Sequence, residues 1–529
     1  MESFLTGIGY PAWALHFLVW FPFVGMLVVL VSAPDQAKRL ALFAAVVELL
    51  VSAPLWWAFN SASAAFQFTS AVPWIPQWGI QYRVGIDGIS VLLVLLTTLI
   101  LPITILGSFR YVTAREKAFY AMILLLETGI IGAFVALDLF QFFMFWEMML
   151  IPMYFIIGVW GGERRIYAAI KFFLFTTAGS LLMLVGILYL FFKYRALTGD
   201  VSFAYGDLLQ IPLSFREQFW LFWAFALAFA VKIPVFPLHT WLPDAHVEAP
   251  TPGSVVLAAI LLKLGTYGFL RFLLPFFPLA ATHPTIVTIM MTLGLVGIIY
   301  AAWVAAVQPD AKKLVAYTSV AHMGFIVLGI FALTVRGIEG GLLVMLAHGL
   351  STGALFLLLG MLYERRHTRL LADFGGLASV MPMFATAFVI TALASIGLPG
   401  TSGFVGEFLA LLGTFETHPW MATLGATGVI FAAYYMLPMV QRILFNTLDR
   451  AENEKLVDLS GREVAVLAPL LIGMLWLGVY PKPFLERMEA TVVELVESVD
   501  ARRAVAPPDL ATVLPLGGLR GPRGPVSGD

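Results

Sequence analysis

Long apolar runs, each about as long as a bilayer is thick, recur from one end of this sequence to the other. A helix needs about 20 apolar residues to cross the hydrocarbon core, and a lipid-exposed backbone must satisfy its own hydrogen bonds. The sequence therefore predicts an all-α polytopic membrane protein with about fourteen transmembrane helices. We place the spans near residues 13–33, 38–58, 85–107, 118–137, 139–160, 166–192, 218–240, 252–277, 284–307, 313–334, 338–363, 380–413, 419–446 and 463–480.

Composition agrees with this class of protein. Of the 529 residues, 60% are hydrophobic and only 12% are charged, whereas about a quarter of a soluble domain is charged. The net charge of −1 does not indicate a nucleic-acid partner. The chain has no Cys, which excludes disulfides, thiol catalysis and thiolate-ligated iron–sulfur clusters. Walker loops, GxGxxG and GxSxG motifs are also absent from the sequence.

The basic residues indicate an orientation. More than half of the 31 Lys and Arg fall on one set of loops, as at Lys312, Lys313, Arg365 and Arg366. The positive-inside rule then places both termini on the outer side. No basic segment precedes the first apolar run, so we expect no cleavable signal peptide. We expect a multi-pass protein of a bacterial cytoplasmic membrane, ending in a short amphipathic stretch at 484–499 and a disordered Pro/Gly-rich tail.

Two segments of the chain resemble each other. TAGSLLMLVGILY (177–189) and STGALFLLLGMLY (351–363) are identical at six of thirteen positions, and at almost the same offset Glu147 aligns with His322. We interpret this as two five-helix repeats, which an odd number of spans makes inverted. The alternative is a chance likeness between Leu- and Gly-rich helices. The predicted divisions are 1–117 (helices 1–3), 118–277 (first repeat), 284–446 (second repeat) and 447–529 (last helix and tail).

Ionisable residues inside apolar spans are the candidate functional residues. Each costs roughly 2.5–3.5 kcal/mol at a helix centre on insertion scales, so each needs a partner or a role. The candidates are Glu127, Glu147, Lys232, Lys263, His322, His348 and Glu407.

Glu147 and Lys232 suggest a switch. A lysine in hydrocarbon tends to lose its proton, and a carboxylate within about 4–6 Å favours the charged form. A pair that opens and closes would therefore release and hold a proton. The alternative is a static ion pair or a lysine that reaches toward the interface.

Two of the spans contain predicted helix breaks. Pro234 and Pro237 follow Lys232 directly, and GLPGTSGFVGE (397–407) ends on Glu407. Proline removes a backbone donor, and a broken helix in a membrane is tolerated where it is buried or lines a wet cavity. Each repeat thus has an ionisable residue beside a break, a pattern typical of ion sites. The alternative is kinking for packing alone.

The remaining candidates suggest a proton relay. Lys263 has about a dozen apolar residues on either side, and His322 and His348 lie on adjacent spans. Histidine titrates near neutral pH, which suits proton transfer. The helices that carry these two histidines offer no third metal ligand near them, so we do not expect a metal site. Glu127 could pair with Lys232 or serve a neighbouring subunit. Asp138 lies at the end of a span and is interpreted as a helix cap or boundary residue. Four polar residues of the HTWLPDAHVE turn could take up protons or only shape the loop: His239, Asp244, His246 and Glu248.

Three motifs carry a resemblance to a known family. VKIPVFPLHTWLPDAHVEAPTPGSVVLAAILLKLGTYGFLR (231–271), FWEMMLIPMYFIIGVWG (145–161) and GLPGTSGFVGEF (397–408) resemble the antiporter-like membrane subunits of respiratory NADH:quinone oxidoreductase (complex I). The resemblance covers about residues 80–480. It is greatest to the M type, because Glu407 stands where the L and N types have Lys.

The resemblance implies roles for the candidates. Glu147 and Lys232 match a paired switch, Lys263 a central lysine, His322 and His348 a hydrated axis, and Glu407 an exit-side residue. It implies a proton-translocating subunit between L- and N-type subunits, with NADH, FMN, iron–sulfur clusters and quinone bound by other subunits and no cofactor here. The alternatives are a D-type subunit of a multisubunit cation/proton antiporter, a membrane subunit of a membrane-bound hydrogenase, and a non-transporting scaffold.

Overall fold

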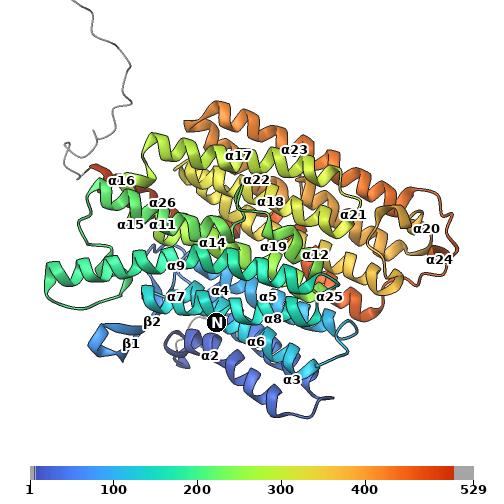
Figure 1. Cartoon of the computed structure of the whole chain (residues 1–529), viewed down its shortest axis with the longest axis horizontal. Coiled ribbons are helices and arrows are strands. Elements are labelled where there is room, and N and C mark those ends of the chain that lie inside the picture. The colour runs from blue at the N-terminus through green and yellow to red at the C-terminus, as the bar shows by residue number, and fades with distance from the viewer. Residues whose placement is uncertain (1–4, 6, 505–529) are drawn as a thin grey trace, which may run out of the picture.

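The computed structural model describes residue 5 and residues 7–504, and this part of the chain is a bundle of long helices (Figure 1). The prediction of an all-α, multi-pass membrane protein is confirmed. Twelve segments of the described residues are long and apolar enough to cross a membrane: Tyr10–Val31, Ala37–Ala58, Ser90–Ser108, Glu116–Val135, Leu139–Trp160, Arg165–Thr198, Thr251–Phe276, Pro284–Ala306, Ala311–Phe331, Val335–Arg366, Pro419–Phe445 and Gly461–Val479. The predicted disordered tail, from residue 505 onward, lies outside the described residues.

The other two predicted spans, 218–240 and 380–413, are the ones with predicted breaks. In the structure the helix of the first span, α11 (Phe215–Lys232), ends at the break, and α12 (Trp241–Glu248) begins just after the predicted span. The second span is divided into α21 (Pro382–Ile396) and α22 (Ser402–Thr417). Lys232 is the last residue of α11, and Glu407 lies in the second turn of α22. The structure therefore confirms that an ionisable residue stands beside each break.

The remaining helices have the following bounds. The first third of the chain contains α2 (Tyr10–Val31), α3 (Ala37–Ser52), α4 (Leu55–Ala58), α5 (Ser90–Ser108), α6 (Glu116–Val135), α7 (Leu139–Met148), α8 (Leu150–Trp160) and α9 (Arg165–Thr198). The middle contains α10 (Tyr205–Leu208), α13 (Thr251–Val256), α14 (Leu262–Gly268), α15 (Leu274–Phe276), α16 (Pro278–Ala281), α17 (Pro284–Ala306), α18 (Ala311–Phe331) and α19 (Val335–Arg366). The last part contains α20 (Leu377–Val380), α23 (Pro419–Val440), α24 (Ala451–Glu454), α25 (Gly461–Val479) and α26 (Lys482–Ala504).

The core of the bundle lies between its first and last helices. The spans Thr251–Phe276 and Val335–Arg366 are buried along their whole apolar length, whereas only 39% and 33% of the first and last spans is buried. In Figure 1 the N-terminal helices and α23 lie on opposite sides of these green and yellow central helices. Two π-helical turns, Leu257–Leu261 and Phe269–Leu273, flank α14. Such turns occur often at functional sites.

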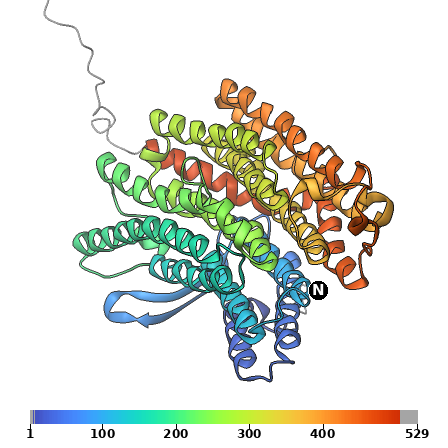
Figure 2. The ribbon, with the colours of Figure 1, turned by 45° about the vertical axis from the view of Figure 1, so that its right-hand side comes forward.

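A β-hairpin occupies most of the segment between the second and third predicted spans, for which the sequence analysis predicted no structure. Strands β1 (Gln67–Ile75) and β2 (Ile80–Ile86) pair antiparallel, and the hairpin extends from the helices in Figure 2. Gly79 closes the turn with φ of 65°, and a Cβ there would lie 2.2 Å from the Val201 carbonyl oxygen. Only glycine fits this position without strain. The sequence analysis missed the strands because it searched this segment for apolar runs.

The C-terminal helix is longer than predicted. The sequence indicated a short amphipathic stretch at 484–499, and the structure has a continuous helix, α26, from Lys482 to Ala504. This helix packs against α19, α15 and α16. Its buried side chains follow helical spacing, among them Met488, Val492 and Val499.

Candidate functional site

Lys263 lies at the centre of the bundle and is fully buried. Its Nζ donates to the carbonyl oxygen of Ala258 at 2.5 Å and lies 2.7 Å from His348 Nδ1. Ala258 belongs to the π-helical turn before α14, where the regular helical hydrogen bonding is interrupted. The local helix geometry therefore supplies one of the two partners that Lys263 has in the described residues.

His322 and Glu407 form the second contact. His322 Nδ1 lies 3.0 Å from Glu407 Oε1, and both side chains are almost fully buried. Ser395 Oγ lies 3.4 Å from the other ring nitrogen of His322. Ser395 is in α21 and Glu407 is in α22, so the two halves of this broken helix both contact the same histidine. The contact is an acid–base pair that a single proton can bridge.

The two contacts lie side by side. The rings of His322 and His348 have centroids 5.6 Å apart at an angle of 65°. Lys263, His348, His322 and Glu407 therefore form one continuous row of titratable groups, which we call the central row. The sequence analysis named all four residues, and the structure brings them together from α14, α19, α18 and α22.

Glu147 and Lys232 do not form an ion pair in this structure, although they lie close enough to interact electrostatically. The Lys232 ammonium lies 5.0 Å from the centre of the Trp146 ring and is without a hydrogen-bond partner in the described residues. Glu147 Oε1 is also unpaired there. Among the described residues, the predicted contact between the two side chains is therefore not formed.

Lys232 is nevertheless linked to the central row by close packing. Gly265, two residues after Lys263, faces the end of α11, and a Cβ on it would lie 2.6 Å from Ile233 Cγ1 and 2.7 Å from the Phe229 carbonyl oxygen. The backbone of α14 therefore approaches the helix end that carries Lys232 as closely as a glycine allows.

Glu147 lines an open apolar groove of about 840 Å³. The groove is bounded by α2, the hairpin, α7, α8 and α9, and its lining includes Trp20, Trp74, Met144 and Ile151. A carboxyl group in such a groove, at the depth of the bilayer, lacks the water that a surface carboxylate has. Glu147 therefore requires either a proton or a polar partner.

Glu127 lies elsewhere. It is fully buried in α6, and neither of its carboxyl oxygens has a hydrogen-bond partner in the described residues. It forms no ion pair with Lys232, so this structure does not contain the contact that one hypothesis required. Its ionisable neighbour is Glu48 of α3, a residue that the sequence analysis did not name.

The four polar residues of the turn after the first break have different surroundings. Asp244 pairs with Lys171 at 2.7 Å, and Glu248 Oε2 accepts from the Arg164 backbone N–H at 2.9 Å. These two residues therefore shape the loop. His239 is buried with Nδ1 unpaired in the described residues, and fully buried His246 stacks on Phe356 with ring centroids 4.6 Å apart.

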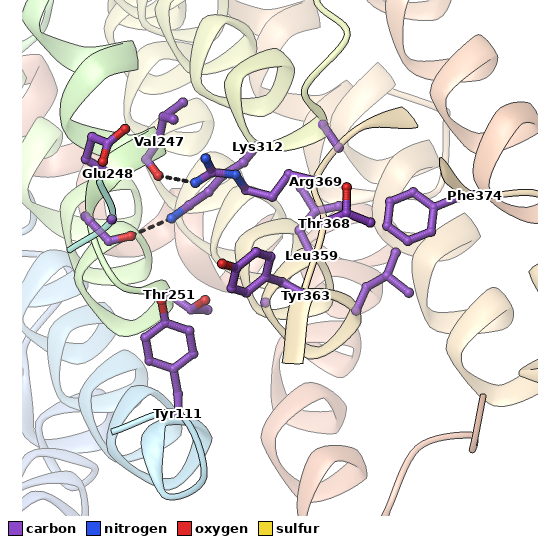
Figure 3. A pocket seen from close by; sticks show the side chains of 15 residues that line it. Tyr111, Val247, Glu248, Thr251, Lys312, Leu359, Tyr363, Thr368, Arg369 and Phe374 are labelled. Carbon is purple, nitrogen blue, oxygen red and sulfur yellow. Dashed lines mark hydrogen bonds between the residues drawn. The ribbon is translucent and has the colours of Figure 1, made fainter. Parts of the chain in front are cut away.

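A small cavity of about 50 Å³ lies beside this turn (Figure 3). Lys312 Nζ donates to the Ala249 carbonyl oxygen at 2.6 Å, and Arg369 donates to the Val247 carbonyl oxygen at 2.6 Å, the two dashed lines of Figure 3. The cavity is polar and large enough to hold water, which needs about 10–15 Å³. It lies beside the C-terminal end of α12, with Glu248 in its lining.

Sequence reasoning missed several ionisable residues. Glu48 lies inside a predicted span, so the same search should have found it. Asp87 and Arg271 also lie in predicted spans and form a buried ion pair at 2.6 Å. Asp138 has the predicted capping role, because its side chain accepts from the Gln141 backbone N–H at the start of α7. Only the fold reveals which of these residues meet.

Comparison with known proteins decides the family. A family described as "NADH:quinone oxidoreductase/Mrp antiporter, TM" matches residues 136–432, and one described as "NADH-ubiquinone oxidoreductase chain 4, amino terminus" matches residues 38–133. The NADH-quinone oxidoreductase subunit M of Rhodobacter capsulatus is 47% identical over 479 residues, covering 89% of this chain and 92% of that protein. This chain belongs to the NADH:quinone oxidoreductase membrane-subunit family, in its subunit M (chain 4) branch.

Other members of the family agree with this assignment. The NADH-ubiquinone oxidoreductase chain 4 of Marchantia polymorpha is 45% identical over 485 residues, covering 91% of this chain and 96% of that protein. A chain of respiratory complex I from Thermus thermophilus superposes with a TM-score of 0.84 at 34% identity, covering 92% of this chain and 99% of that chain. An Mrp complex from Dietzia sp. shares the fold alone, with a TM-score of 0.80 at 20% identity over 94% of this chain and 99% of that chain.

Proposed function

We propose that this chain is a proton-translocating membrane subunit of NADH:quinone oxidoreductase, which couples electron transfer from NADH to quinone to proton transport. The observation that carries the proposal is the central row. This row places a lysine, two histidines and a glutamate next to one another in space, in the buried middle of a membrane protein. Ionisable residues in such a place need a functional reason. The 20% identity to the Mrp chain supports only a shared fold for the antiporter alternative.

The proposed mechanism is a switch followed by a relay. While Glu147 lies near Lys232, its carboxylate favours the protonated ammonium. When the pair opens, Lys232 releases its proton, and Lys263 in the adjoining α14 takes part in the transfer. His348 and His322 then pass a proton between their ring nitrogens toward the carboxyl group of Glu407. The absence of an ion pair between Glu147 and Lys232 among the described residues supports the open state.

The arrangement of the two breaks supports the inverted-repeat prediction. Lys232 ends α11 just before one break, and Glu407 follows the other break in α22. In this proposal helices 4–8 (118–277) and 9–13 (284–446) are the two repeats. Both termini lie on the outer side of the bacterial cytoplasmic membrane. The cavity of Figure 3, near Lys312 and Arg369, is then the inner-side approach for protons.

We assign the groove at Glu147 to contact with a neighbouring membrane subunit. Trp74, Met144 and Ile151 are exposed apolar residues of this groove, which also contains the Glu147 carboxyl group, one oxygen of which has no hydrogen-bond partner in the described residues. In this proposal L- and N-type subunits lie on either side of the chain. NADH, FMN, iron–sulfur clusters and quinone bind to other subunits of the complex.

The proposal is tested by proton pumping and NADH:quinone turnover in membranes that carry Glu147→Gln in the assembled complex. Glutamine retains the size of the side chain but cannot attract the Lys232 proton, so we expect both rates to fall steeply. Glu163→Gln is the matched control, because Glu163 is an exposed glutamate in the loop between α8 and α9. If pumping and turnover both survive Glu147→Gln in assembled complex, the pair is structural and the proposed path is wrong.

A further inference from the structure

Two buried carboxyl groups lie outside the proposed path. Glu48 of α3 and Glu127 of α6 are both fully buried. All four of their carboxyl oxygens are without a hydrogen-bond partner in the described residues, and neither glutamate forms an ion pair there. A carboxylate buried in this way is much less stable than a carboxylic acid, because nothing replaces the lost hydration.

The two residues lie at the same depth in neighbouring helices. Helices α3 and α6 pack against each other, and Lys38 Nζ near the start of α3 lies 3.8 Å from Glu116 Oε2 at the start of α6. Glu48 and Glu127 follow these residues by ten and eleven positions in the sequence. At about 1.5 Å per residue both are carried roughly 15–17 Å along their helices, to about the middle of a bilayer.

The two carboxyl groups therefore interact mainly with each other. Glu48 lies within range of the charge of Glu127. Ionisable residues on the elements packed against α3 and α6 include His16 on α2, Glu147 on α7 and Lys263 on α14, and none of them contacts either glutamate. The nearest polar neighbours along α3 are hydroxyls, because Ser52, one turn from Glu48, contacts Thr98 Oγ1 at 2.6 Å. Two carboxylates at the same depth of packed helices, with no cation paired to either, disfavour each other's charge.

We propose that Glu48 and Glu127 together form a second intramembrane proton-binding site, a carboxyl pair that holds at least one proton between them. The pair binds a proton by converting one carboxylate to a carboxylic acid and releases it by the reverse step, so no other reactant is needed. This site adds to the proposed function, which uses only the Glu147–Lys232 pair and the central row.

The position of the pair relates it to Glu147. Gly129 and Gly132 of α6 lie against α7, and a Cβ on Gly129 would lie 2.6 Å from Met149 Cγ and 3.3 Å from the Phe145 carbonyl oxygen. The segment of α6 just after Glu127 therefore packs closely against Phe145 and Met149, which lie on either side of Glu147 in the sequence. A change of charge in the pair thus occurs on α6, which packs directly against α7, the helix that carries Glu147.

Infrared difference spectroscopy of the assembled complex, between acidic and alkaline buffer, tests the pair directly. We expect a band from the protonated carboxylic-acid C=O that shifts on exchange into heavy water. Glu48→Gln and Glu127→Gln should each remove part of this band and shift what remains, because each glutamate loses its charged neighbour. Glu163→Gln, in an exposed loop, should leave the band unchanged.

Independent behaviour would overturn the proposal. If each variant removes its own contribution and leaves the other unshifted, or if the band does not respond to either variant, the two residues do not form a shared site. Glu48→Asp guards against failure to assemble, because it keeps the acid and moves it by one methylene, so it should shift the band without removing it. An unshifted band in that variant counts against the pair.

The same preparations separate this inference from the proposed function. Proton pumping is measured in parallel with the spectra, with Glu147→Gln included. If Glu147→Gln leaves pumping intact while the shared band is present, the proposed path fails and the carboxyl pair stands. If pumping depends on Glu147 but the spectra show no coupling between Glu48 and Glu127, the path stands and the pair fails.

Discussion

At the scale of single residues, the central row works because its members differ in what they can do with a proton. Lys263 has no carboxylate partner in the described residues, and its contacts are a backbone carbonyl and a histidine. When Lys263 donates to His348 Nδ1, the proton of that imidazole lies on Nε2. His322 lies next to this ring and contacts Glu407, so the chemistry changes along the row from an amine to a carboxyl group.

Lys263→Arg tests whether release of the proton matters. Arginine keeps the positive charge but does not deprotonate in proteins. We therefore expect Lys263→Arg to lower proton pumping at least about tenfold, a barrier rise of roughly 1.4 kcal/mol. Lys263→Met, which removes the charge altogether, should lower it to a similar extent. Pumping is measured on complex shown by native electrophoresis to be assembled. Retention of near-normal pumping by Lys263→Arg would mean that Lys263 acts only as a fixed charge.

At the scale of elements, the break between α21 and α22 positions Glu407. Gly397 ends α21 with φ of 84°, and a Cβ on it would lie 2.9 Å from Glu407 Oε2. Gly400, in the same break, has φ of 88° and no atom within 4 Å of such a Cβ. Both glycines of the break therefore have the left-handed backbone conformation that favours glycine, but only Gly397 is next to the Glu407 carboxyl group.

These glycines form a matched pair of variants. We expect Gly397→Ala and Gly400→Ala each to lower stability by about 1–2 kcal/mol, the cost of a left-handed conformation for an L-residue. Only Gly397→Ala should also displace Glu407 and lower pumping. Thermal unfolding of the complex measures the loss of stability. A proton-uptake assay measures the loss of pumping. Equal pumping losses in both variants would show that the break matters only as a strained turn.

Close packing between α6 and α7 is a second feature at this scale. A Cβ on Gly132 would lie 2.5 Å from the Phe145 ring. We expect Gly132→Ala to cost about 1–3 kcal/mol, as overpacking of a core typically does. Gly7→Ala is the control, because a Cβ there meets nothing within 4 Å. Thermal unfolding measures both. A Gly132→Ala variant as stable as the control would mean that α6 and α7 can separate freely.

At the scale of the whole molecule, a buried ion pair joins distant parts of the chain. Arg271, in the π-helical turn after α14, contacts Asp87 at 2.6 Å, just before α5, and Arg271 Nε donates to the Tyr267 hydroxyl at 3.1 Å. Gly88, which follows Asp87 in the chain, donates its backbone N–H to Thr491 Oγ1 of α26 at 3.0 Å. The first helices, the helix that carries Lys263 and the C-terminal helix therefore meet at one point.

Removing this contact should weaken the fold. Arg271→Ala leaves Asp87 buried without its cation, and we expect a cost of about 3–5 kcal/mol. Arg336→Ala removes an exposed pair with Glu416 and should cost at most about 1 kcal/mol. Thermal unfolding of the assembled complex compares the two. Equal effects would show that the Arg271–Asp87 contact carries no special weight in joining the three regions.

Much of this protein follows from the sequence alone. Apolar run length determines the membrane helices, because backbone groups in lipid must bond within a segment. The cost of ionisable groups in hydrocarbon singled out Glu147, Lys232, Lys263 and the other candidates. Proline and glycine indicated the two breaks, since both disrupt regular helical bonding.

Only the tertiary structure decided which of these groups meet. Lys263 and His348 are 85 positions apart in the sequence, as are His322 and Glu407. No local pattern specifies such contacts, because they depend on how whole helices pack. The same holds for Glu48, whose burial beside Glu127 comes from the packing of α3 on α6. The hairpin and the length of α26 also depended on packing, because neither has the long apolar run that identifies a membrane span.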